Sequence, residues 1–433
     1  MSTNRTFLNL EKGPGFRSGI GDLWKFLSVA AIGNAVIAWF FWASKTIVMI
    51  DIGQKAGLSP NVIASWIFIL HLFNGVLALV MCLYYKQPFV IAGMIPLYAI
   101  LLNAIKYASY AEICGAFLLA GVVIVILGVT GATKKILTYL PMPVVMGMVA
   151  GALFSLTLPM FTTAKDMPLV WVISIAAFFI VLMIPKLERN FPAALLAMIM
   201  GLIALTATGQ TSWNQMSVPT PTILFQMPEL SIRAVLGMTI PTLALFLGLN
   251  TIQAAGSLKL NGYNPPVTSM TVICGFATIV GSFFCSFPCS PAGPTTAMLS
   301  GPASGEKLEG RYVAAFITSI LQILFAVFIM ALVSLTNCVP PAFISCIAAL
   351  AMLNVTLSAL RSAFSGGFKL GAVIAFLITM SGIVFLGISA AFWGLVGGIL
   401  VSVLVERDEF KAFIKATKKK NEEEAKICAE ASA

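Results

Sequence analysis

The side chains with the clearest chemical potential are a few polar groups inside long apolar runs. Lys45 is the most informative, because the chain around it is otherwise apolar from Phe26 to Ile50. An ammonium group in such a run is costly, so in a membrane protein it marks a functional site by default. Lys45 therefore predicts a countercharge for an anionic substrate. The alternative is a lysine that extends outward to the helix end and pairs with Asp51.

Two short segments, 87–104 and 287–302, carry Pro and Gly at matching places. Their first residues cannot keep regular helical hydrogen bonds, and a half-helix is predicted to begin near Met94–Pro96 and near Pro294–Thr296. Because a helix N-terminus presents free N–H groups and about half a positive charge, two of them facing each other predict an anion seat. The alternative is that these kinks serve packing. The candidate substrate-binding residues are Lys45, Met94, Asn250, Gln253, Ser290, Pro294, Thr295 and Thr296.

Proton coupling requires a titratable group, and acidic residues are scarce in the apolar runs. Asp51 and Glu112 lie at predicted helix ends, and His71 is the single histidine. All three are candidate coupling residues, although a histidine in a helix bundle more often serves packing. Cys285 and Cys289 have no third ligand nearby, so no metal is predicted. No phosphate-binding loop is present, which gives no support to ATP-driven transport or to a cofactor.

The elements that must position these residues are membrane helices. The chain has 433 residues, of which 59% are hydrophobic and 10% charged, whereas soluble domains are about 25% charged. Many apolar runs reach the roughly 20 residues that a membrane helix needs, without the alternation of membrane strands. The formal charge of +10 falls in short loops and tails, so membrane lipid is the expected surrounding and nucleic-acid binding is not indicated. No nucleophile–base pair is visible, so an enzyme is not expected.

The apolar runs predict an all-α integral membrane protein with about fourteen transmembrane segments. They lie near 24–50, 61–85, 87–104, 110–130, 139–158, 168–185, 190–208, 232–258, 266–286, 287–302, 311–335, 339–360, 368–386 and 388–405. The polar stretch between the seventh and eighth segments divides the chain into two halves. The predicted organisation is an N-terminal tail 1–23, a first half 24–208, a connection 209–231, a second half 232–405 and a C-terminal tail 406–433.

The distribution of positive charge predicts the orientation. With the N-terminus inside, 21 of the 26 Lys and Arg residues fall in inner loops and tails, four fall in outer loops, and Lys45 lies within the first segment. Cytoplasmic loops carry the excess of Lys and Arg in membrane proteins. We therefore expect both termini in the cytoplasm, at the cell's inner membrane.

An internal repeat relates the two halves. Four short matches occur in the same order with offsets near 200, and the clearest joins Pro88–Gly93 to Pro288–Gly293. The offset also places Lys45 opposite Asn250 in the eighth segment. Seven segments per half make the two copies oppositely oriented, which is the inverted repeat of many secondary transporters. In such carriers the paired broken segments mark the substrate site near mid-membrane.

Specific motifs then suggest a family. The chain resembles the benzoate membrane transporter family, which is similar to the nucleobase and sulfate carriers of seven-plus-seven fold, and the resemblance extends from about Ala43 to Val405. It rests on Gly128-Val129-Thr130-Gly131, Leu140-Pro141-Met142-Pro143, Asn261-Gly262-Tyr263-Asn264-Pro265-Pro266 and Gly387-Ile388-Ser389-Ala390-Ala391-Phe392-Trp393-Gly394-Leu395. The resemblance implies a short strand and a half-helix in segments three and ten, and proton-linked uptake of benzoate or a similar aromatic carboxylate. Lys45 and the run Phe287–Pro291 depart from the pattern of that family.

The sequence therefore predicts a secondary carrier that imports a small organic anion, with protons, by alternating access. Phe89, Tyr98 and Phe287 are candidate apolar walls, although such residues more often serve packing. A nucleobase or inorganic-anion carrier and an anion channel remain alternatives; the first would place acids in segments eight and ten, which have none. The oligomeric state is open, and a homodimer is allowed.

Overall fold

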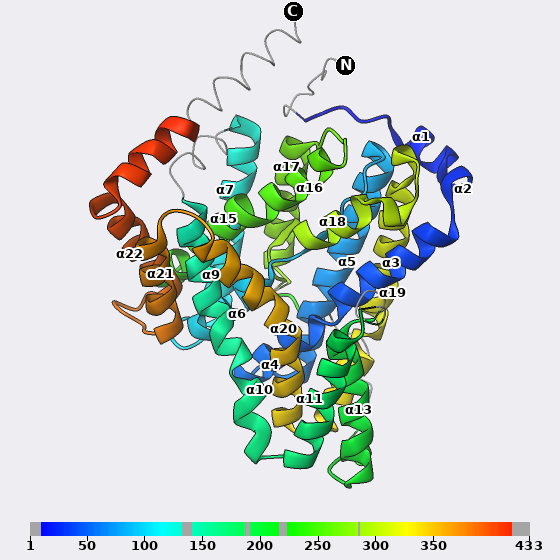
Figure 1. Ribbon diagram of the computed structural model, residues 1–433, viewed down its shortest axis with the longest axis vertical. Helices are drawn as coiled ribbons and strands as arrows, with labels where there is room; N and C mark the ends of the chain where they lie inside the picture. The colour runs from blue at the N-terminus through cyan, green and yellow to red at the C-terminus, as the bar shows by residue number, and fades with distance from the viewer. Residues whose placement is uncertain are drawn as a thin grey trace, which may run out of the picture.

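The computed structural model describes residues 10–131, 141–185, 187, 191–215, 223–284 and 286–417. Of the predicted tails and connections, residues 1–9, 132–140, 216–222 and 418–433 lie outside this part, as does Cys285. The regular secondary structure of the described chain is helical apart from two three-residue strands and one isolated bridge. Both of its ends lie at the same end of the molecule, at the top of Figure 1.

The helices pack as two groups. We call the first group the core bundle; in it α5 packs against α19, α7 against α17, and α3 against α19. It lies mostly on the right of Figure 1. It comprises α3 (Val29–Ala43), α4 (Thr46–Lys55), α5 (Pro60–Tyr85), β1 (Ile91–Gly93), α6 (Ile95–Ala104), α7 (Tyr110–Thr130), α14 (Ile232–Ala234), η3 (Val235–Thr239), α15 (Ile240–Leu245), η4 (Phe246–Thr251), α16 (Ile252–Leu260), α17 (Val267–Ser282), β2 (Cys289–Pro291), α18 (Gly293–Ser300) and α19 (Tyr312–Asn337).

We call the second group the gate bundle; in it α9 packs against α20 and α21, α21 against α22, and α11 against α13. It forms the left and lower parts of Figure 1. It comprises α9 (Met142–Thr157), α10 (Pro159–Thr162), α11 (Pro168–Met183), α13 (Ala193–Ala207), α20 (Pro341–Phe364), α21 (Lys369–Ser381) and α22 (Ala390–Leu404). Each bundle takes helices from both halves of the sequence, so the region between the bundles is bordered by both halves.

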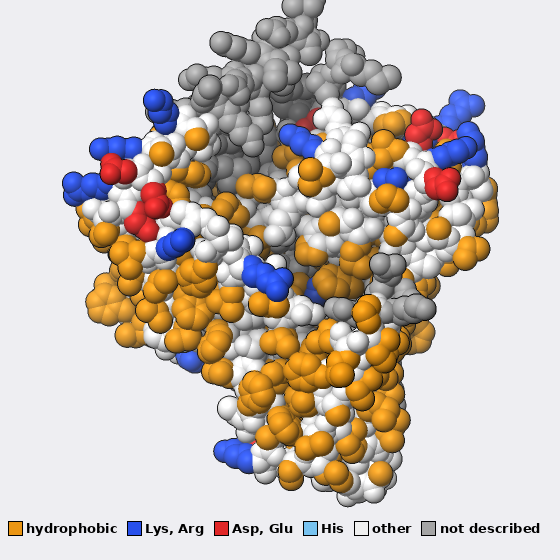
Figure 2. Space-filling view, viewed as in Figure 1, with side chains coloured by type: hydrophobic (Ala, Val, Ile, Leu, Met, Phe, Trp, Pro, Cys, Tyr) orange, Lys and Arg blue, Asp and Glu red, His pale blue; other side chains and the backbone are white. Residues whose placement is uncertain are grey.

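The predicted membrane segments agree with the helices. Within the described residues, seven helices are long and apolar enough to cross a membrane, five more are apolar but shorter, and α22 forms a bent pair with the helix Arg407–Thr417. Every one of the fourteen predicted segments contains a helix. Figure 2 shows hydrophobic side chains over the middle and lower surface, with charged side chains gathered toward the end that holds both chain ends.

The first predicted segment, 24–50, was misplaced by about five residues. The Ser28 hydroxyl accepts a hydrogen bond from Ala31 N and begins α3, and the span continues through α4 to Lys55. Asp51 was predicted at a helix end, but it lies within α4 and is only 4% exposed. The prediction failed because Asp51, a buried carboxylate that pairs with the exposed Lys55 at the end of the span, was read as the polar boundary of the helix.

The two broken segments meet at their strands. β1 and β2 pair antiparallel with Ile91 opposite Pro291, Ala92 opposite Ser290 and Gly93 opposite Cys289. Residues 91 and 291 are also equivalent in the repeat, so the repeat axis passes through this pair. Each strand leads into a half-helix, α6 or α18, that has Pro at its second position. The predicted seven-plus-seven fold with a short strand and a half-helix in segments three and ten is confirmed.

Close helix contact in the gate bundle depends on Gly147 of α9. A Cβ at this position would collide with the backbone carbonyl of Ala372 on α21, which cannot move without shifting that helix. We expect Gly147→Val to cost about 1–3 kcal/mol through overpacking, measured as a lower melting temperature in detergent. Gly33→Val is the matched control, because a Cβ added at Gly33 would meet no atom within 4 Å. Equal melting temperatures for the two variants would contradict this account.

Candidate functional site

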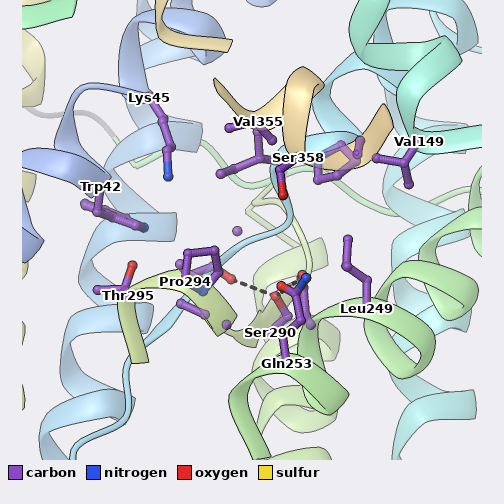
Figure 3. Close-up of a pocket in the computed structure, with 18 of the residues that line it drawn as sticks. Trp42, Lys45, Val149, Leu249, Gln253, Ser290, Pro294, Thr295, Val355 and Ser358 are labelled. Carbon is purple, nitrogen blue, oxygen red and sulfur yellow. Dashed lines mark hydrogen bonds between the residues drawn. The ribbon is translucent and has the colours of Figure 1, made fainter. Parts of the chain in front are cut away.

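A cavity of about 250 Å³ lies between the two bundles. Figure 2 shows the surface hollowed between them, and Figure 3 shows the side chains that surround the space. The core bundle supplies one wall from α3, the half-helices α6 and α18, and the η4–α16 region; the gate bundle supplies the other from α9 and α20. The site therefore sits where a movement of one bundle against the other would change access.

Six of the eight predicted substrate-binding residues line this cavity. They are Lys45, Asn250, Gln253, Ser290, Pro294 and Thr295. The other two are buried beside it: Met94 is fully buried, and the Thr296 hydroxyl accepts a hydrogen bond from Val90 N at 3.4 Å. Thr296 therefore holds the segment before β1, and neither residue borders the cavity.

The starts of α6 and α18 both face the cavity, through Ile95 and Pro96 in one and Gly293 to Thr295 in the other. The first N–H groups of a helix have no partner within it, and they place partial positive charge at this end. Beside them the Asn250 amide donates to Ser290 Oγ at 2.8 Å, and Ser290 Oγ donates to Ala92 O at 3.1 Å. This chain of hydrogen bonds fixes both side chains at the site.

A widened helix turn brings Asn250 to this position. The segment η4 is a π-helix, in which Thr251 Oγ1 donates to Phe246 O, five residues earlier, at 2.8 Å. Such π-turns occur frequently at functional sites. The sequence identified Asn250 from the repeat but not the π-turn, because no residue type marks that turn.

Lys45 lies at the junction between α3 and α4. The Ser44 hydroxyl donates to Phe41 O at 3.0 Å, and Lys45 N bonds to Trp42 O, so the regular helical pattern is interrupted there. Side chains of serine that bond back to the preceding turn compete with helical hydrogen bonds. The interruption places Lys45 toward the space in Figure 3, between Trp42 and Val355.

The ammonium of Lys45 has no carboxylate partner among the described residues. Its residue is 6% exposed, and Nζ lies 3.4 Å from the centre of the Phe41 ring. A desolvated cation–π contact contributes about 2 kcal/mol, less than the several kcal/mol that ion burial costs. Asp51 instead accepts from Lys55 at 2.6 Å and from the Ser345 hydroxyl at 2.5 Å. The alternative in which Lys45 pairs with Asp51 is therefore wrong.

The cavity walls do not include the three candidate aromatics Phe89, Tyr98 and Phe287. Phe89 and Phe287 are buried outside the cavity, and Phe287 packs against Trp66 and Tyr98. The walls that the sequence did not identify are Phe41, Trp42, Met146, Val149, Leu249, Asn354, Val355, Ser358 and Ala359. Asn354 and Ser358 are one turn apart on α20, so their spacing was an available signal for a polar stripe on an apolar helix.

The three candidate coupling residues have separate surroundings. His71 is fully buried on α5, with Nε2 3.3 Å from Thr46 Oγ1 and its ring against Trp42. It borders a void of about 10 Å³ together with Lys45 and Tyr98. Glu112 forms a capping box with Ser109 at the start of α7, and its Oε2 accepts from Ser109 N at 2.6 Å. Neither Glu112 nor Asp51 lines the cavity.

Comparisons with known proteins agree with this architecture. A family model described as benzoate membrane transport protein matches residues 25–404. The benzoate membrane transport protein of Acinetobacter baylyi is 26% identical over 375 residues, which cover 86% of this chain and 93% of the relative. Inner membrane protein YdcO of Escherichia coli is 26% identical over 397 residues, covering 89% and 96%. Among solved structures, the transmembrane domain of a cyanobacterium bicarbonate transporter, BicA, superposes with a TM-score of 0.58 at 13% identity, covering 86% and 97%.

Proposed function

Because this chain belongs to the benzoate membrane transport protein family, we propose that it imports benzoate or a similar aromatic carboxylate, together with protons, by alternating access. The observation that carries the substrate assignment is the position of a buried lysine beside aromatic walls. Lys45 and the two half-helix starts offer positive charge to a carboxylate, while Phe41 and Trp42 offer a surface to a ring.

The size of the cavity supports this class of substrate. A cavity of about 150 Å³ is enough to bind benzene, and this one measures about 250 Å³. The described residues that line it include no Asp or Glu, which argues against a nucleobase carrier that would use an acid to hold the base. An inorganic anion would leave the aromatic walls without a contact, so it is the weaker candidate.

The proposal also includes the orientation of the protein in the membrane and the movement of the two bundles. We assign the end that holds both chain ends to the cytoplasm, since charged side chains gather there. The two halves, 24–208 and 232–405, would act as the inverted repeats, and rocking of the gate bundle against the core bundle would expose the cavity to each side in turn. A homodimer stays a prediction.

The test is uptake of labelled benzoate by the purified protein in proteoliposomes, with and without an inward proton gradient. We expect saturable, gradient-driven uptake that unlabelled benzoate inhibits. Burying a phenyl ring contributes about 1.5–3 kcal/mol, so acetate should compete about 10- to 150-fold more weakly, and neutral benzamide should not compete.

Two results would contradict the proposal. Uptake that never saturates would indicate a channel. Transport of bicarbonate, with no benzoate uptake by protein shown to be folded, would indicate an inorganic-anion carrier of the same fold.

A further inference from the structure

We propose that Lys45 is itself the proton-coupling group, and that it binds a proton when the carboxylate enters and releases it when the site empties. This inference rests on the proposed function. In the step that we infer, the neutral Lys45 amine takes one proton from solution and becomes an ammonium paired with the carboxylate. No covalent bond of the substrate is made or broken, and the proton returns to solution when the substrate leaves.

The surroundings of Lys45 in the empty site favour the neutral amine. Among the described residues that line the cavity and the adjoining void there is no Asp or Glu. The titratable groups that face Lys45 across the void are His71 from α5 and Tyr98 from α6, and both are neutral in their ordinary buried forms. Asp51, on the same helix as Lys45, is already held by Lys55 and Ser345.

The remaining electrostatic contributions do not balance an ammonium. The starts of α6 and α18 place partial positive charge at the cavity. The gate bundle presents Asn354 and Ser358, which are uncharged. Among the described residues, the Phe41 ring attracts the cation through a cation–π contact, and this attraction is weaker than the cost of burying an unpaired charge.

A bound carboxylate reverses this balance. It supplies the missing negative charge next to Lys45, and the half-helix starts then stabilise the pair. The loaded site and the empty site are each neutral overall, so both forms can cross the low-dielectric interface between the bundles. One proton then travels with each carboxylate, and no separate acidic coupling residue is needed.

The void beside Lys45 offers a path for the proton. Its volume of about 10 Å³ is close to the minimum that holds one water molecule. Thr46 and His71 border it, and His71 Nδ1 is buried without a hydrogen-bond partner among the described atoms. A water molecule there would reach Lys45 and these neighbours, with His71 in a supporting position and not as the coupling group.

Lys45→Arg separates coupling from binding, because a guanidinium stays charged at all working pH values. We expect this variant to exchange external for internal benzoate in proteoliposomes, since the loaded form stays neutral. Net uptake driven by a proton gradient should be lost, because the empty, charged site cannot return. Asp166→Asn changes an exposed group outside the cavity, so it is the control and should keep both exchange and net uptake. His71→Asn tests the residue beside the void, and it should keep exchange and still couple one proton to each benzoate.

A second measurement uses the unmodified protein. Calorimetric titration with benzoate at pH 8, in buffers of different ionisation enthalpy, gives the number of protons taken up on binding. We expect about one proton per benzoate for the wild type and for His71→Asn, and about zero for Lys45→Arg. Lys45→Met should bind benzoate more weakly and also take up no proton.

The outcomes separate the two proposals. Benzoate binding by the wild type without proton uptake, or gradient-driven net uptake by Lys45→Arg, would overturn the role of Lys45 and leave the substrate assignment intact. Loss of proton uptake in His71→Asn would move the coupling group to His71. A folded wild type that does not bind benzoate would overturn the proposed function and this inference with it.

Discussion

Replacing Gly293 with alanine is expected to remove most benzoate binding while the protein stays folded. A Cβ on Gly293 would lie 2.5 Å from the Cβ of Gln253 and 2.6 Å from its Oε1. The Cβ of Gln253 cannot swing away, because it is attached directly to the backbone of α16. The first turn of α18 would therefore have to move, and its N–H groups would leave the anion seat.

The size of the effect follows from the bonds that would be lost. A hydrogen bond to a charged group contributes about 1.5–3 kcal/mol, which corresponds to a roughly 10- to 150-fold weaker dissociation constant for each donor displaced. Gly293 and Thr295 are the cavity-lining residues of that turn that carry an N–H. The measurement is a titration of the purified variant with labelled benzoate, together with a thermal melt.

The matched control is Gly301→Ala, the same change directly after the same half-helix. A Cβ on Gly301 would meet nothing closer than 3.7 Å, so this variant should bind benzoate as the wild type does. If Gly293→Ala melts normally and binds with unchanged affinity, the start of α18 does not hold the substrate. The anion seat would then have to be assigned to Lys45 alone.

The sequence predicted the architecture well because membrane helices obey strong and simple constraints. Length and polarity located fourteen segments, and Pro and Gly at matching offsets located the two broken ones. The strand pair formed with Ile91 opposite Pro291, two residues that the repeat had already related. These features depend on local backbone preferences. Apolar runs, Pro and Gly reveal such preferences directly in the sequence.

The walls of the cavity were harder to predict, because they depend on which helix faces approach each other. Val149 and Val355 come from two gate-bundle helices, and in sequence neither differs from the many apolar residues that face lipid. Phe287 was a candidate wall for which packing was the more frequent role, and it packs between Trp66 and Tyr98. The sequence signal for the cavity came from polar residues in apolar runs, such as Lys45 and Asn250, and from the Pro and Gly residues of the two broken segments.

Removing the carboxylate of Asp51 is expected to destabilise the protein and to open the contact between the two bundles. Asp51 on α4 accepts a hydrogen bond from Ser345 on α20, so this contact joins the core bundle to the gate bundle. Breaking a buried charged pair costs about 3–5 kcal/mol. Because Lys55 is 35% exposed and keeps its water, we expect Asp51→Ala to cost less, about 1–3 kcal/mol.

The position of this contact predicts a role in access to the cavity. Asp51 lies six residues beyond Lys45, about 9 Å along a helix, and Ser345 lies nine residues before Asn354, about 13 Å along α20. The start of α20 is low in Figure 1, away from the end that holds both chain ends. The contact therefore lies on the side of the cavity opposite the proposed cytoplasmic end, where it would close the path to the outside.

Cys346 provides the readout, since it is fully buried next to Ser345. In a variant whose other seven cysteines are replaced by alanine, a membrane-impermeant maleimide added outside should label Cys346 faster after Asp51→Ala. Ser345→Ala removes one hydrogen bond and leaves the Asp51–Lys55 pair, so it should have a smaller effect in the same direction. Exposed Asp166 supplies the control, and Asp166→Ala should change neither labelling nor melting. A lower melting temperature with unchanged labelling would mean that Asp51 stabilises the fold without closing the outer path. If the contact does close this path, breaking it must expose the interface that contains Cys346.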